Sequence, residues 1–129
     1  MALDPKKTLD AYRAKRGEFR ILEVPLMQYL MVDGAGDPNS AQAYQDAVSA
    51  LFPVAYTLKF ASRDQLGIDT VVMPLEGQWH APDMESFTSR RDKSAWEWTL
   101  MIMVPEHVTR EMFDLSLIHI SEPTRQEAI

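Results

Sequence analysis

Glu76 is the residue of this sequence with the clearest chemical potential. It lies within TVVMPLEGQW, residues 70–79, among apolar and β-branched neighbours. A carboxylate that loses water on burial has a raised pKa, and it can then act as a general acid or base or attract a cation. The alternative is that Glu76 points into solvent on an edge strand or pairs with an arginine. Glu76 is therefore the candidate for a catalytic or cation-binding group.

Four further side chains could line a ligand site around this carboxylate. Trp79 and Trp98 offer flat aromatic surfaces of the kind that stack on planar or cationic molecules. Tyr56 carries a hydroxyl that could donate to a ligand, and Met101 offers adaptable apolar contact. The alternative for the tryptophans and the methionine is packing in the core. The alternative for Tyr56 is a core tyrosine whose hydroxyl reaches the surface.

Other site chemistry finds no support in the sequence. It contains no cysteine, and no nucleophile elbow, phosphate-binding loop or cluster of metal ligands is present. His80 and His107 have no partners at ligand spacing, so we expect both to lie at the surface. Neither a metal nor a cofactor is expected.

Two predicted strands would position these residues. Residues 70–79 and 96–104 are rich in β-branched and aromatic residues, and neither fits a helical period. A period of two puts Glu76 on one face of its strand and Trp79 on the other. In the second strand Trp98 and Met101 likewise fall on opposite faces. Because both faces are mostly apolar, we expect a helix to cover one side of the sheet and a pocket to open on the other.

The chain before these strands divides into an arm, a strand and a helix. Residues 4–16 are polar and predict an outer arm or short helix, and residues 19–32 predict a first strand broken at Pro25. A turn is expected over residues 33–39. Residues 40–61 show an apolar stripe at helical spacing, which predicts a long helix. Pro53 lies inside that helix, so a kink is expected near residues 49–53.

The chain after residue 79 predicts a flap and a second helix. Residues 80–94 are polar, long for a hairpin connection, and carry Arg90 and Arg91. Thr109 is placed to cap a helix that follows the last strand. Residues 115–125 resemble the translation of a transposase sequencing adapter. We therefore expect residues 1–114 to be the natural sequence and residues 115–129 to be a non-native tail.

Composition limits the classes of function. The 129 residues carry 13 basic and 19 acidic side chains, a formal net charge of −6, and show no basic patch. Nucleic-acid binding is therefore disfavoured, because the phosphate backbone favours clustered lysine and arginine. The sequence has no long apolar run and no signal peptide, so we expect a cytoplasmic protein that does not interact with membranes.

Four segments in a fixed order resemble the GyrI-like small-molecule-binding domain family. They are YLMVDGAGDPN at residues 29–39, ALFPVAYTLKF at 50–60, VVMPLEGQW at 71–79 and WTLMIMVPEHVT at 98–109. The resemblance extends over residues 4–114. Pro53 departs from the family pattern, in which a small polar residue is usual at this position.

The resemblance implies an α+β fold. In this family two βαββ units form antiparallel sheet, each with a long helix on one face, and a ligand cleft lies between them. Residues 1–114 would be the first unit. Some relatives sense ligands in transcription activators, and some stand-alone relatives hydrolyse cyclopropane-bearing genotoxins.

Three functions are compatible with this sequence. The first is binding of small hydrophobic, aromatic or cationic molecules through Tyr56, Glu76, Trp79, Trp98 and Met101. The second is hydrolysis of a strained electrophile, with Glu76 activating water. The third is inhibition of gyrase or a similar protein by surface contact. A homodimer formed through exposed sheet is also compatible with the sequence.

Overall fold

The computed structural model describes residues 2–88 and 92–121. Its main elements are β1 (Gln28–Ala35), α2 (Gln42–Leu66), β2 (Leu75–His80), β3 (Glu97–Val104) and α3 (Arg110–Ser121). Short helical segments occur at α1 (Pro5–Thr8) and, as 3-10 turns, at Asp10–Tyr12, Met84–Ser86 and Lys93–Ala95. The predicted order of strand, helix, strand, strand and helix is confirmed.

The three strands form one antiparallel sheet with β3 in the centre. The strand order is β1-β3-β2, with Leu30 opposite Ile102 and Leu75 opposite Ile102 on the other side. Every residue of β3 after Glu97 is buried, because the strand has a neighbour on each edge and α2 packs on one of its faces. The fold is therefore α+β, as the sequence predicted.

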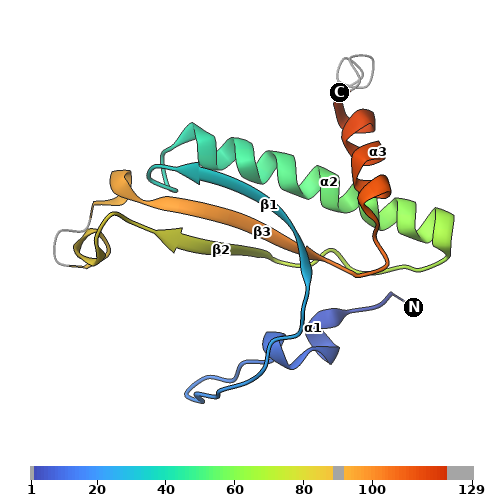
Figure 1. Ribbon diagram of the computed structural model, residues 1–129, viewed down its shortest axis with the longest axis horizontal. Coiled ribbons are helices and arrows are strands. Elements are labelled where there is room, and N and C mark those ends of the chain that lie inside the picture. The colour runs from blue at the N-terminus through green and yellow to red at the C-terminus, as the bar shows by residue number, and fades with distance from the viewer. Residues whose placement is uncertain (1, 89–91, 122–129) are drawn as a thin grey trace.

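Helix α2 covers one face of the sheet along most of its length (Figure 1). Its buried residues recur at spacings of three and four and form the core with the sheet: Ala47, Leu51, Val54, Ala55, Leu58 and Ser62. The predicted end at residue 61 is too early, since the helix continues to Leu66. Gly67 ends it in the left-handed conformation, with φ of 67°, which is readily open to glycine.

Pro53 does not divide α2 into two helices. The helix runs uninterrupted through this residue, and the proline ring lies on its exposed side. The Thr57 hydroxyl donates a 2.8 Å hydrogen bond to the Pro53 carbonyl. Because the ring lies on the solvent side, the missing N–H disturbs no contact with the sheet.

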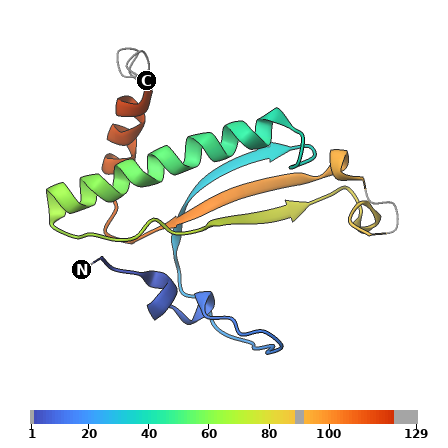
Figure 2. The same cartoon turned by 180° about the vertical axis from the view of Figure 1, so that it is seen from behind.

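The first predicted strand is shorter than expected at its N-terminal side. β1 starts at Gln28, whose partner Val104 is the last residue of β3, so residues 19–27 have no strand to pair with. β1 also continues to Ala35, into the predicted turn. Residues 2–27 form what we call the N-terminal arm, and Figures 1 and 2 show α1 on the opposite side of the sheet from α2.

The second predicted strand is also shorter than expected. β2 begins at Leu75, directly after Pro74, and not at Thr70. Residues 68–74 lead from α2 to the sheet, and Thr70 instead forms a single parallel bridge with Leu3 of the arm. The third strand matches its predicted range to within one residue.

Helix α3 follows β3 and packs against α2 (Figure 1). The Thr109 hydroxyl accepts a 3.2 Å hydrogen bond from the Met112 backbone N–H, which confirms the predicted cap. α3 continues to Ser121, so the segment expected to be a non-native tail begins inside this helix. Residues 122–129 lie outside the described part of the chain. Among the described helices, none has both the length and the apolar character needed to span a bilayer.

Candidate functional site on the arm side of the sheet

The two faces of the sheet separate the predicted site residues. Glu76 and Met101 are register partners, and so are Trp79 and Trp98. Because side chains alternate along a strand, the first pair lies on the face opposite α2, and the second pair lies beneath the helix. The expectation that all of these side chains line one hollow is therefore wrong. The face opposite α2, which the N-terminal arm approaches, is called the arm-side face below.

Glu76 has a partner that sequence reasoning missed. The Tyr12 hydroxyl donates a 2.5 Å hydrogen bond to Glu76 Oε2, across 64 residues of sequence. Burial raises the pKa of the Tyr12 phenol well above its ordinary value, and the Glu76 carboxylate and Tyr29 raise it further. The available signal was weak: Leu9 and Tyr12 are the large apolar residues of an otherwise polar segment.

Methionines form the apolar floor beside this pair. Met101 and Met103 are each 8% exposed, on the same face of β3 as Glu76 is on β2. Met31 of β1, the register partner of Met101, is 57% exposed. The flexible thioether side chains can adapt to ligands of different shape. Glu76 thus lies at the edge of an apolar surface, beside the phenols of Tyr12 and of Tyr29, which is the register partner of Met103.

A ligand-sized hollow lies between the arm and this floor. Its volume is about 580 Å³, and Leu9, Met27, Met103 and Glu106 are among its lining residues. This volume falls in the range of small-molecule sites, roughly 300–1,000 Å³. Glu76 does not line the hollow itself, but Met103 is two residues along β3 from Met101, the strand partner of Glu76.

The far end of the arm-side face is more polar. A second hollow of about 400 Å³ there is lined partly by Asp33, His80 and Glu97. The Thr99 hydroxyl donates a 2.6 Å hydrogen bond to Asp33, which fixes that carboxylate on the sheet. His80, expected at the surface, is indeed exposed.

Trp98 belongs to the core. Its side chain is 2% exposed and lies over Gly34, where an added Cβ would come within 2.1 Å of the indole ring. The ring makes an edge contact with Tyr44 of α2 at 5.4 Å, and its Nε1 donates to the Gly36 carbonyl at 3.3 Å. In this conformation Trp98 is enclosed by protein, as the core alternative predicted.

Trp79 is part of an aromatic cluster at one end of the helix side. It is 41% exposed, stacks on Tyr44 at 6.4 Å and makes an edge contact with Trp96 at 5.8 Å. Phe87, from the connection between β2 and β3, packs against Trp96 at 5.3 Å. The predicted flap thus contacts the helix-side aromatics; its Arg90 and Arg91 lie outside the described residues.

Tyr56 lies apart from both groups. It is 48% exposed on α2 and packs beside Phe60, one helical turn further along, at 6.4 Å. Its neighbour Ala55 faces the core, so the tyrosine projects from the solvent side of the helix. The structure therefore does not bring Tyr56 to Glu76, Met101 or the tryptophans.

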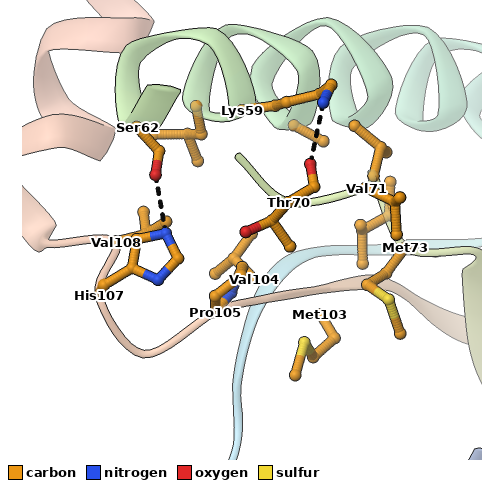
Figure 3. A pocket seen from close by; sticks show the side chains of 14 residues that line it. Lys59, Ser62, Thr70, Val71, Met73, Met103, Val104, Pro105, His107 and Val108 are labelled. Atoms are coloured by element: carbon orange, nitrogen blue, oxygen red, sulfur yellow. Dashed lines mark hydrogen bonds between the residues drawn. The ribbon is translucent and has the colours of Figure 1, made fainter. Parts of the chain in front are cut away.

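A serine–histidine contact elsewhere in the fold has the wrong donor pattern for nucleophilic catalysis. Ser62 Oγ lies 2.7 Å from His107 Nε2 (Figure 3). The Ser62 hydroxyl donates a hydrogen bond to the Ile68 carbonyl at 2.8 Å. His107 Nε2 is therefore the donor to Ser62, and it cannot take the serine proton as a base must. Ser62 is also 1% exposed. The pair joins α2 to the loop before α3, and His107 is half-buried where a surface position was expected.

A metal centre finds no support in the part of the chain that the structure describes. No three histidine, aspartate or glutamate side chains there come together in a way that could hold a metal ion. The candidate site thus relies on Glu76 and Tyr12 for its chemistry.

The sequence matches no protein-family model and no curated protein. It is similar to solved structures from Listeria innocua. An uncharacterized conserved protein is 38% identical, with a TM-score of 0.76, and the match covers 88% of this chain and 56% of that chain. A protein described as a hydrolase is 36% identical, with a TM-score of 0.72 and coverage of 88% and 54%. A further structure described as a hydrolase is 34% identical, with a TM-score of 0.75 and coverage of 92% and 58%. The chain therefore shares its fold with these proteins and spans little more than half of the length of each.

Proposed function

We propose that this chain binds a small, largely apolar molecule on the arm-side face, as a cytoplasmic protein of the GyrI-like kind, with Glu76 as the polar anchor. The observation that carries the proposal is the Glu76–Tyr12 pair at the edge of a methionine floor. An aromatic cation fits this surface, because the carboxylate attracts its charge and the methionines contact its rings. The hollow of about 580 Å³ beside Met103 supplies the volume.

Titration calorimetry with tetraphenylphosphonium, a lipophilic aromatic cation, tests this proposal. Binding to the full chain should weaken about tenfold or more in Glu76→Gln, which corresponds to about 1.4 kcal/mol. The matched control is Glu97→Gln, which removes a carboxylate from the far end of the same face and should change the affinity less. Equal affinities in the native protein and Glu76→Gln would contradict the assignment of Glu76 as the anchor.

Hydrolysis is the second candidate function. Two of the similar structures are described as hydrolases, and the direct Tyr12–Glu76 hydrogen bond places a proton donor beside a potential base. For a cyclopropane-bearing electrophile, Glu76 would take a proton from water while the water oxygen bonds to the ring carbon. The ring bond to that carbon then breaks, and the released electron pair takes the proton of Tyr12. Transfer of a proton from Glu76 back to Tyr12 restores both groups, so that the net reaction adds one water.

Mass spectrometry of a cyclopropane-bearing genotoxin incubated with the protein tests this second function. The product should be heavier than the substrate by one water, and its formation should be lost in Glu76→Gln. Tyr12→Phe should slow the reaction and leave binding largely intact, because the variant keeps the aromatic ring. If the native protein binds the genotoxin but forms no product, the hydrolase function is excluded and the small-molecule-binding function remains.

A further inference from the structure

Thr70 carries a buried hydroxyl with no hydrogen-bond partner. The residue is 4% exposed and lies in the segment that connects α2 to β2. Its backbone carbonyl accepts a 3.1 Å hydrogen bond from Lys59. Among the described residues, Thr70 Oγ1 is the buried side-chain polar atom for which no hydrogen-bond partner is found. A buried hydroxyl left in this state costs about 1–3 kcal/mol, so native proteins rarely retain one.

The hydroxyl borders a small cavity between three segments of the chain. Ser62 of α2, Thr70, and Val104 and His107 on either side of the turn after β3 are among its lining residues. Figure 3 shows the Thr70 oxygen directed toward His107, on the same side as the Ser62–His107 hydrogen bond. Lys59 also lines the cavity, but its ammonium group binds Asp69 and the Thr70 carbonyl. The other walls are apolar, so Thr70, Ser62 and His107 are the polar side chains that an occupant could contact.

The size of the cavity decides what can occupy it. Its volume is about 20 Å³. A single water needs roughly 10–15 Å³ by the same measure, whereas small-molecule sites begin at roughly 300 Å³. The cavity can therefore hold one water and excludes an organic ligand.

We propose that one ordered water occupies this cavity as an integral part of the fold. The water accepts a hydrogen bond from the Thr70 hydroxyl and donates one to the remaining lone pair of Ser62 Oγ. That lone pair is available because the Ser62 hydroxyl donates to Ile68 and accepts from His107. The water thereby links the segment before β2 to α2 and, through Ser62, to the turn before α3.

Nuclear magnetic resonance on the full chain tests the proposal directly. A bound water in this cavity gives water-to-protein cross-relaxation peaks at the Thr70 methyl group and the His107 ring protons. The peaks at the His107 ring protons should persist in Thr70→Ser, which keeps the hydroxyl but has no methyl group. They should disappear in Thr70→Val, which has the shape of threonine without the hydroxyl.

The melting temperature of Thr70→Val gives an independent outcome. If the water is present, the variant loses its hydrogen bonds, and the melting temperature falls by about 2–5 °C. If the hydroxyl is simply unpaired, valine removes the cost of burying it, and the melting temperature rises. A rise, or the absence of the water peaks in the native protein, overturns the proposal. Should Thr70→Val fail to fold, the peaks in the native protein and in Thr70→Ser decide.

Discussion

The Tyr12 hydroxyl donates a 2.5 Å hydrogen bond to Glu76 Oε2, and so joins the N-terminal arm to the sheet. This contact gives the arm a role in the candidate site. The hydrogen bond keeps the Tyr12 phenol protonated. It also holds the Glu76 carboxylate on the arm-side face, beside Met101. A ligand that forms a hydrogen bond or an ion pair with Glu76 must either share the carboxylate with the Tyr12 hydroxyl or displace that hydroxyl.

Tyr12→Phe should lower the free energy of unfolding at pH 7. It should also make that free energy depend less on pH above pH 10. At pH 7 the loss of a hydrogen bond to a carboxylate lowers the free energy of unfolding by about 1–2 kcal/mol. The pKa of Tyr12 is raised in the folded protein from an ordinary value of 10.0, so its stabilisation is complete below pH 10 and is lost as the pH rises above it. Urea unfolding at pH 7 and above pH 10 measures both effects.

The absorbance of tyrosinate provides a check on this interpretation. Tyr12 stays protonated in the folded protein near pH 10, so Tyr12→Phe should leave the tyrosinate absorbance that develops there unchanged. A clear decrease in that absorbance would show that Tyr12 ionises normally and has no close contact with Glu76.

Gly34→Ala should be strongly destabilising. An alanine Cβ would lie 2.1 Å from the Trp98 ring, which is fixed in the core between β1 and Tyr44. We expect the free energy of unfolding to fall by about 3 kcal/mol, from overpacking and displacement of the indole. Gly77→Ala is the matched control: its Cβ would lie 3.1 Å from the half-exposed Trp79, which has room to move. Thermal unfolding of both variants should show the larger loss for Gly34→Ala.

The Lys59–Asp69 ion pair should make the free energy of unfolding fall at acidic pH. Lys59 Nζ lies 2.6 Å from Asp69 Oδ1, and this hydrogen bond lowers the pKa of Asp69 below its ordinary value of 3.8. The folded state then binds fewer protons than the unfolded state, so the stabilisation is present above pH 3.8 and lost as the pH falls further. Asp69→Asn should be less stable than the native protein at pH 7, and the difference should shrink toward pH 2 in urea titrations.

Asp64→Asn is the control for this ion pair. Asp64 pairs with its sequence neighbour Arg63 at the surface, where ion pairs contribute little. A loss at pH 7 as large as that of Asp69→Asn would mean that general charge balance, and not the Lys59 contact, sets the effect.

Pro53→Ala should stabilise α2. Alanine restores a backbone N–H in the helix interior at an exposed position, so we expect a gain of about 2 kcal/mol in the free energy of unfolding. Ser49→Ala, one turn earlier and also exposed, should gain only the small difference in helix propensity, about 0.5 kcal/mol. A loss of stability in Pro53→Ala, measured by urea unfolding, would show that the proline supports the local geometry.

Local patterns determined the elements of this protein and their order. Helix α2 was predicted from a stripe at spacings of three and four, and β3 from its alternating aromatic and aliphatic residues. The cap at Thr109 follows the same logic, since a hydroxyl placed just before a helix satisfies a free N–H. Each of these signals depends on neighbours within a few residues, which a sequence displays directly.

Strand ends and the composition of the site were decided by tertiary structure. β1 begins where its partner β3 ends, so this boundary depends on strand pairing and not on the residues of β1 alone. Residues 70–74 have a strand-like composition, but Thr70 pairs with Leu3 of the arm and β2 begins only at Leu75. The alternation of side chains along β2 places Glu76 and Trp79 on opposite faces of the sheet. Only the tertiary structure decides that α2 packs on the Trp79 face and that the N-terminal arm approaches the Glu76 face.

The Tyr12–Glu76 contact could not be predicted from the sequence. The two residues are 64 positions apart, and no local pattern connects a tyrosine in a polar arm to a carboxylate on a strand. The water cavity at Thr70 likewise exists only where α2, the segment before β2 and the turn after β3 converge. A sequence specifies which side chains alternate and repeat, whereas contacts between distant segments depend on how the packed elements fit together.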